Sequence, residues 1–509
     1  MKSKNRGIKM SQLVDRWGIG TVFAFLIIKL LQGAKRIFPP KEDGWRRAAR
    51  AYISLEHHKF GLGFFGIRPA GEIEASPGDA AEALARRLAE FLRGYPISYV
   101  TLDWGMFCVR LSHKKTCEVV LTAYAQDGSM EWLKPFLEPG STPPPECENE
   151  LLDLIRESYN DARGLPDLAR PRRLRRKVAK GIRRLCRPAN RRPAAAYADR
   201  ILSSACVYVD SLPYENEFQD PEYVRMKPLG FSPLQFHIQC DFPANNANIW
   251  VYCNHAAEDG RAILDMMDDL IRQWGRSRPV LYPQSGYASK PVCCSSDGKK
   301  IWHVAMYFDF VPFFAERRRL TQAYGVDVPV IALLSWNVTG HPAFAKHRFS
   351  LPVEIPAAAG RETSLGFVYI LPSKYRDGNA PEEGLLNYLA EFARLRDETK
   401  ARRSASYEML ESFALLPPVF YKMTLALMPR AMAGFVGTMG LTVLNGAGYI
   451  VVTSCDSQPE AFISFGSLNL PSQDGGTVGA VSIKCRPEKI EFYANALREI
   501  FGEARATDN

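Results

Sequence analysis

A histidine, an aspartate and a glycine stand close together at one point of this 509-residue chain. They are His255, Asp259 and Gly260, separated as His-x-x-x-Asp-Gly. An imidazole can take up and release a proton near neutral pH, and a strand end would hold the ring rigidly beside an opening. The placement would therefore be useful for a proton transfer by the histidine, and the aspartate and the glycine would form the sharp turn that follows.

The segments on either side of this motif have different periodicities. Residues 249–254 are apolar and rich in β-branched and aromatic side chains, which predicts a buried strand. From Arg261 to Gly275, apolar residues recur every three or four positions, which predicts an amphipathic helix. These apolar residues are Ile263, Met266, Met267, Leu270, Ile271 and Trp274. A structural interpretation stays open, with Asp259 as a helix N-cap, Gly260 as a turn residue and His255 as a half-buried histidine.

The motif in this context resembles the signature of the chloramphenicol acetyltransferase-like superfamily. That group includes nonribosomal peptide condensation domains, BAHD acyltransferases and wax ester synthases. The resemblance implies that His255 is the general base of acyl transfer. It implies a mainly structural Asp259, paired with an arginine for which Arg348 and Arg361 are the candidates. Many members have a histidine where this chain has Asn254, and several branches lack it.

Segments of the second half also resemble this family. Residues 348–355 contain Leu-Pro-Val and precede Leu-Gly-Phe at 365–367, where the family has a strand with Val-Pro-Val and then Leu-Gly-Asn, so Phe367 replaces the asparagine. Residues 449–454, 461–468 and 478–484 resemble its C-terminal strands. BAHD members carry Asp-Phe-Gly-Trp-Gly where this chain has Ser464-Phe465-Gly466, so the aspartate of that motif is absent.

The resemblance implies an α/β (α+β) fold of two similar halves. Each half would be a mixed sheet flanked by helices, and the halves would face each other across a central tunnel. Residues 45–275 would form the first half, with a basic insert at 164–193. Residues 276–300 read as a polar linker and residues 301–509 as the second half. Residues 1–44 would form an apolar and basic N-terminal segment.

Periodicity predicts the main elements of both halves. Helices are expected at 80–92, 261–275, 328–337 and 382–402. Strands are expected at 97–111, 117–125, 206–209, 234–241, 249–254, 348–355, 365–371, 449–454, 461–468 and 478–484, with a hairpin turn at 243–248. The apolar segment 415–436 either lines a pocket or packs as core.

The composition is that of a soluble globular protein, with 46% hydrophobic and 24% charged residues. The 11 cysteines form no Cys-x-x-Cys pair, and no His/Cys cluster has zinc spacing. We therefore expect reduced thiols, no structural metal and a cytoplasmic location, with a peripheral place at the inner membrane face as an option. His57 and His58 lack an acid or glycine at the right spacing and read as surface polar residues.

The net charge of +10 is concentrated in one stretch, residues 172–192, which has many arginines and lysines and no acidic residue. Leu174, Val178, Ile182 and Leu185 could give it one apolar stripe. Such a helix suits an anionic membrane surface. A solvated loop and a contact with coenzyme A phosphates are the other interpretations, and we expect no nucleic acid because no stacking platform accompanies the stretch.

Residues 18–31 are apolar except Lys29, and they are too short to span a bilayer comfortably. The segment could be a helix buried against the body, a helix lying in a membrane surface or a helix that docks a partner.

The resemblance implies an acyl thioester donor, most simply an acyl-CoA, otherwise an acyl carrier protein thioester, with no permanently bound cofactor. The acceptor would be an alcohol or an amine. By position, Ser454 or Ser464 could donate a hydrogen bond to the oxyanion, although either could be a plain strand serine. Transfer to a hydroxyl of a hydrophobic or lipid-like acceptor is the preferred function. An amide-forming condensation and a catalytically silent binding or scaffold protein are the alternatives.

Other enzyme classes fit worse. The sequence has no Gly-x-Ser-x-Gly elbow, no phosphate-binding glycine loop and no Gly-x-Gly-x-x-Gly after a strand. Two fused halves would make a monomer sufficient.

Overall fold

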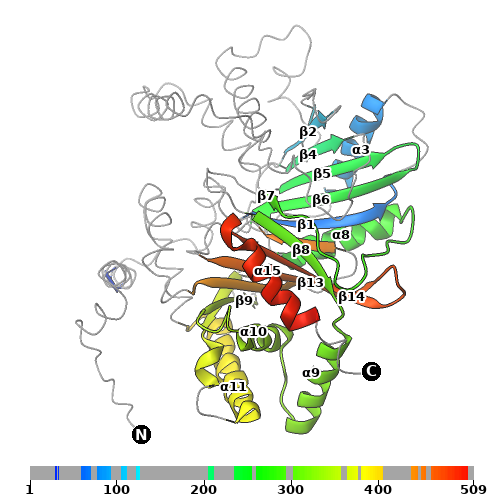
Figure 1. The fold of residues 1–509 in the computed structure, drawn as a ribbon. Coiled ribbons are helices and arrows are strands. Elements are labelled where there is room, and N and C mark those ends of the chain that lie inside the picture. The colour runs from blue at the N-terminus through cyan, green and yellow to red at the C-terminus, as the bar shows by residue number, and fades with distance from the viewer. Residues whose placement is uncertain are drawn as a thin grey trace, which may run out of the picture. The chain divides into compact units, whose positions relative to one another are not determined.

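The computed structural model of the chain describes fifteen stretches of it. They are residues 29–30, 33, 59–69, 77–92, 105–111, 122–125, 205–210, 234–254, 260–293, 302–356, 364–376, 380–404, 437–444, 449–453 and 460–502. The chain divides into two compact units (Figure 1). The N-terminal unit spans Gly61–Glu258 and Ala262–Pro279. The C-terminal unit contains Val280–Asn509 together with Asp259–Arg261 and the first 60 residues.

One mixed sheet forms the centre of the N-terminal unit. Six of its strands lie in the order β1 (Lys59–Ile67), β6 (Asn246–Asn254), β5 (Leu234–Asp241), β4 (Ala205–Asp210), β2 (Gly105–Leu111) and β3 (Thr122–Ala125). Strands β2, β4 and β5 run parallel, whereas β3 and β6 run antiparallel to their partners β2 and β5. The helices α3 (Pro77–Leu92) and α8 (Gly260–Trp274) complete the described part of the unit.

The hairpin between β5 and β6 turns where the sequence predicts. The side chain of Asp241 accepts a hydrogen bond from the N–H of Ala244 at 3.2 Å. Asn245 has a positive φ of 48°, which asparagine tolerates better than most residues. The polar residues of this turn therefore fix the register of the two strands.

The end of α8 is tied to β1 by several hydrogen bonds. Gly275 O accepts from the N–H of Arg68 at 3.0 Å, and Gly66 O accepts from the N–H of Ser277 at the same distance. The guanidinium of Arg276 donates to Phe65 O at 2.9 Å. These bonds satisfy backbone groups at the point where the helix ends.

A second mixed sheet forms the centre of the C-terminal unit. Its order is β10 (Ser364–Ile370), β9 (Phe349–Ile355), β11 (Met439–Leu444), β13 (Ala461–Pro471), β14 (Thr477–Cys485), β8 (Trp302–Phe308) and β7 (Val292–Cys293). The helices are α9 (Val311–Tyr324), α10 (Val330–Gly340), α11 (Pro381–Lys400), α15 (Pro487–Gly502) and the short 3-10 helix η2 (Pro372–Tyr375); β12 covers Tyr449–Thr453. Two mixed sheets flanked by helices confirm the predicted fold class.

The two sheets repeat the same strand pattern. In the N-terminal sheet, Met106, Ala205, Leu234 and Cys253 are direct neighbours across β2, β4, β5 and β6. In the C-terminal sheet, the same row across β9, β11, β13 and β14 contains Phe349, Met439, Ala461 and Cys485. Strand directions agree at every step, and a helix follows the last strand in both cases. The predicted similarity of the halves is thus visible in strand order, direction and register.

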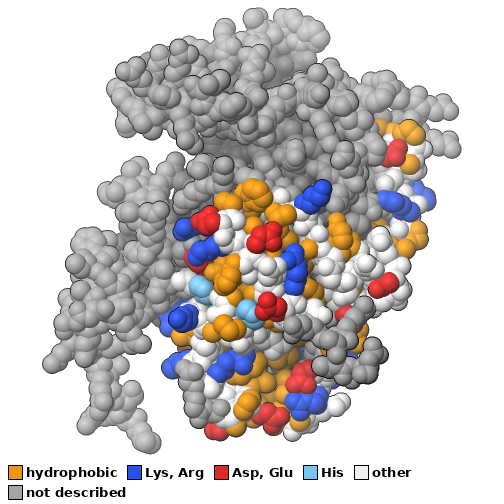
Figure 2. Space-filling model, viewed as in Figure 1, with side chains coloured by type: hydrophobic (Ala, Val, Ile, Leu, Met, Phe, Trp, Pro, Cys, Tyr) orange, Lys and Arg blue, Asp and Glu red, His pale blue; other side chains and the backbone are white. Residues whose placement is uncertain are grey.

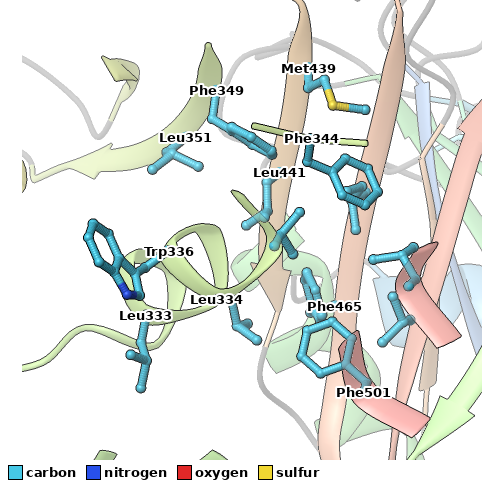
Figure 3. Packing of buried hydrophobic residues seen from close by; sticks show 14 of the residues in the cluster. Leu333, Leu334, Trp336, Phe344, Phe349, Leu351, Met439, Leu441, Phe465 and Phe501 are labelled. Carbon is cyan, nitrogen blue, oxygen red and sulfur yellow. The ribbon is translucent and has the colours of Figure 1, made fainter. Parts of the chain in front are cut away.

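The core of the C-terminal unit lies between one face of its sheet and the helices. Helix α10 is apolar on most sides, as its sequence Val-Ile-Ala-Leu-Leu-Ser-Trp requires for a buried helix. Figure 3 shows its side chains close to strand residues such as Leu351, Leu441 and Phe465. The hydroxyls of Ser335 and Tyr388, buried in this layer, are hydrogen-bonded to each other at 2.6 Å. The core is therefore apolar, with its buried polar pair satisfied.

The outer surfaces of these helices carry charges of both signs, with apolar side chains among them (Figure 2). On α11, Arg394 pairs with Glu391 at 2.8 Å and with Glu398 at 2.5 Å. On α9, Arg319 pairs with Glu316 at 2.7 Å. Exposed pairs of this kind contribute about 0–1 kcal/mol each, so burial stabilises the unit far more than they do. Among the residues that the structure describes, no helix is long and apolar enough to cross a membrane.

Gly384 in α11 tests this packing directly. A Cβ at this position would lie 2.3 Å from the carbonyl oxygen of Tyr375, which is a backbone atom. Helix propensity alone favours alanine by about 1 kcal/mol, whereas the clash should cost about 1–3 kcal/mol. We expect Gly384→Ala to lower the unfolding midpoint.

The matched control is Gly502→Ala at the end of α15, where nothing lies within 4 Å of the added Cβ. Denaturant unfolding of the three proteins measures the difference. Equal midpoints for the two variants would contradict the contact between α11 and η2.

Candidate functional site

The histidine motif occupies the connection between β6 and α8. Strand β6 ends at Asn254 and helix α8 begins at Gly260. His255 and Asp259 lie outside the described residues. The strand is buried from Ala247 to Cys253, between β1 and β5, and the predicted helix presents buried Met267, Leu270 and Trp274. The predicted strand and helix around the motif are therefore confirmed.

Gly260 is buried, and a side chain at this position would require its neighbour to shift. A Cβ on this residue would lie 3.0 Å and 3.1 Å from the two terminal methyl carbons of Leu444, at the end of β11. Its φ is not among the positive values. The glycine is therefore explained by close packing at the first residue of the helix, and a left-handed turn conformation is not the reason for it.

A histidine outside the predicted site lies on the strand beside the motif strand. His237 in β5 is fully buried and stacks on Tyr208 of β4, with ring centroids 4.4 Å apart and an angle of 17° between the planes. It meets Tyr252 of β6 edge-on at 5.0 Å. The alternation of Gln235, His237 and Gln239 along β5 was the available signal, because alternate residues share one face.

Ser464 lies in the middle of the C-terminal sheet. It is 1% exposed, and its direct neighbours are Thr442 on β11 and Ser482 on β14. Directly opposed side chains have Cβ atoms about 4.5–5.5 Å apart, so three hydroxyls form a row across three strands. Alternate residues of these strands, among them Val481 and Ile483, belong to the helix-covered core. Ser464 is thus on the opposite face.

The next row of this face carries charge. Two residues further along β14 is Lys484, and its direct partner on β8 is His303. We call Thr442, Ser464, Ser482, Lys484 and His303 the polar face of the C-terminal sheet. Burial, followed by the charge of Lys484, lowers the pKa of His303 to about 3, so its imidazole is neutral at physiological pH.

The other predicted site residues are placed as follows. Ser454 follows the last residue of β12 and lies outside the described residues, as does Arg361. Arg348 is half-buried immediately before β9, and its carbonyl oxygen accepts hydrogen bonds from the N–H groups of Thr438 at 3.0 Å and Met439 at 3.3 Å. Its pairing with Asp259 stays a prediction. In the described part of the chain, no group of three or more His, Cys, Asp or Glu residues could hold a metal ion.

No protein-family model and no curated protein sequence matches the chain. Several solved structures are similar to it. They include the wax ester synthase/diacylglycerol acyltransferase from Marinobacter aquaeolei VT8, with 13% identity over 90% of this chain and 97% of that chain, at a TM-score of 0.35. VibH, a nonribosomal peptide condensation enzyme, has 9% identity over 94% and 95%, at 0.37.

A third similar structure is the TRI3 trichothecene 15-O-acetyltransferase from Fusarium sporotrichioides. It shares 11% identity over 89% of this chain and 94% of that chain, at a TM-score of 0.42. By their names, the three proteins are acyl-transfer or condensation enzymes.

The buried imidazole of His303 should make stability depend on pH. In the unfolded chain its pKa is near 6.5, so on acidification the unfolded state takes up the proton first. Stability is complete above that value and is lost as the pH falls from about 6.5 toward 3. The loss amounts to about 2 kcal/mol between about pH 7 and pH 5.

Comparison of His303→Gln with wild type isolates this contribution, because the carboxylates are common to both proteins. We expect the variant to lose less stability over the same pH range, measured by urea unfolding. Parallel pH profiles would show that His303 titrates normally in the folded protein.

Proposed function

We propose that this chain transfers an acyl group from a thioester to a hydroxyl of a hydrophobic acceptor, with His255 as the general base. One observation carries the proposal: the first five residues of the His-x-x-x-Asp-Gly motif connect a buried strand to an amphipathic helix, and the glycine begins that helix. Packed elements stand on both sides of this connection in the sequence. General-base catalysis needs a fixed position more than it needs an unusual pKa.

The reaction needs no covalent intermediate on the protein. The acceptor oxygen attacks the thioester carbonyl while His255 takes its proton, so a C–O bond forms. The tetrahedral intermediate then expels the thiolate, the C–S bond breaks, and the imidazolium returns the proton to sulfur. The donor would be an acyl-CoA or a carrier-protein thioester, and no permanently bound cofactor takes part.

Ser464 and Ser454 are the proposed donors to the oxyanion. Ser464 is supported by its burial and by its place in the hydroxyl row, since a donor in a site without water stabilises developing charge strongly. Ser454 is supported by its place after β12 alone. Asp259 would fix the loop through an ion pair with Arg348 or Arg361.

Replacement of the base should abolish transfer while leaving the fold intact. We expect His255→Ala to reduce kcat/KM by about 10²–10⁴, the usual contribution of a positioned base. The measurement is thiol release from a panel of acyl-CoAs, each tested with alcohols and with amines. His341→Ala is the matched control, because that ring pairs with Glu499 at 2.7 Å and belongs to no predicted site.

Ser464→Ala belongs in the same assay, with Ser350→Ala, another buried serine of the C-terminal sheet, beside it. A fall of about 10²–10³ in kcat for the first alone would support the oxyanion role. Turnover with amines only would favour the condensation alternative. Unchanged thiol release by His255→Ala would refute the proposal, and no release by wild type with any substrate would favour a binding or scaffold role.

A membrane-derived acceptor is the second part of the proposal. Residues 18–31 are apolar and residues 172–192 are basic with an apolar stripe, a combination that suits an anionic membrane surface. We expect the chain to float with anionic liposomes and to lose this binding at high salt. Deletion of residues 1–38 should weaken flotation severalfold; unchanged flotation of the deletion variant would exclude a contribution of that segment.

A further inference from the structure

A lysine is buried in the C-terminal sheet without a counter-charge. Lys484 is 6% exposed, and no hydrogen bond or ion pair joins its ammonium group to any residue that the structure describes. Lysines are almost never buried unless they are paired. The position therefore suits an anionic ligand, since no anion comes from the residues that the structure describes.

The neighbour of Lys484 adds a second unsatisfied group. His303, 3% exposed, is its direct partner on β8, and its Nε2 is buried with no hydrogen-bond partner among the described residues. Directly paired residues of antiparallel strands have Cβ atoms about 4.5–5.5 Å apart, so both side chains can reach one small group. The ammonium group offers hydrogen-bond donors, and the neutral imidazole can offer one more N–H.

The surroundings favour a ligand over a structural role. Both residues lie on the polar face, whereas the adjacent Val304 and Ile483 belong to the core under the helices. Ser482, the next residue of β14 on this face, adds a hydroxyl, and Phe462, the neighbour of Lys484 on β13, adds an apolar wall. The charge of Lys484 does not contribute to the packing of the apolar core, because the core lies on the other face of the sheet.

We propose that Lys484 and His303 bind an oxyanion with one negative charge, a carboxylate or a phosphodiester, belonging to a ligand of this protein. One ammonium group beside a neutral imidazole supplies a single positive charge. A carboxylate or a phosphodiester neutralises it, whereas a dianion would leave a buried negative charge uncompensated. The inference stands on these two residues and holds whether or not the chain transfers acyl groups.

Thermal unfolding of the full chain tests the site without an activity assay. The unfolding midpoint is measured at constant ionic strength while chloride is replaced by sodium acetate or by sodium diethyl phosphate. We expect the wild-type midpoint to rise by about 2–4 °C in at least one of the two series, since a ligand that binds only the folded state stabilises it. A rise of the midpoint in acetate alone would identify a carboxylate site. A rise in diethyl phosphate alone would identify a phosphodiester site.

Two variants separate specific binding from a general salt effect. Lys484→Met keeps the length of the side chain and removes its charge; it should unfold at a higher temperature than wild type in chloride and should not respond to either anion. Lys400→Met, at the exposed end of α11, should respond as wild type does. His303→Gln keeps the charge of Lys484 and should respond to the anions more weakly than wild type. This variant tests the site if Lys484→Met does not fold.

The proposal is overturned by a flat wild-type midpoint in both series. It is also overturned if Lys484→Met or His303→Gln responds as strongly as wild type. Failure of the acyl-transfer assay with a positive anion response would remove the proposed function and leave this site in place.

Discussion

The two-residue period of the strands is the constraint on which this structure depends. Along β13 and β14, alternate side chains enter the apolar layer under α10, α11 and α15, and those between them point to the other face. A shift of register by one residue would place Ser464 and Lys484 in that layer and move Phe465 and Ile483 to the polar face. The fold and the chemistry of the polar face are therefore fixed by the same pairing.

Periodicity explains how much of the fold could be predicted. Helices and strands with a strong apolar period, such as α8, β5 and β14, are close to their expected bounds. The terminal helix α15 was not predicted, although Ile490, Tyr493, Ala494 and Leu497 have helical spacing and are buried. The similarity of the two sheets could not be derived from single segments, because it resides in the order and register of strands far apart in the sequence.

In the candidate site, too, local patterns could be predicted, and contacts between residues far apart in the sequence could not. A local pattern was sufficient to find the strand, the motif and the helix around His255. The close packing at Gly260 involves Leu444, nearly two hundred residues away, and no local pattern contains that contact. His237, His303 and Lys484 were missed for a related reason: a single polar residue within an apolar strand acquires meaning only when its neighbours on the adjacent strands are known.

The repeated register lets the two sheets be compared residue by residue. The row that contains Tyr208, His237 and Trp250 in the N-terminal sheet corresponds to Thr442, Ser464 and Ser482 in the C-terminal sheet. One half thus fills these positions with rings and the other with small hydroxyls. In a symmetric dimer of identical subunits, every substitution occurs twice and both copies must tolerate it. Here both copies of the pattern belong to one polypeptide, so a substitution in one sheet leaves the other unchanged. One sheet can therefore carry bulky rings at these positions while the other carries small hydroxyl groups.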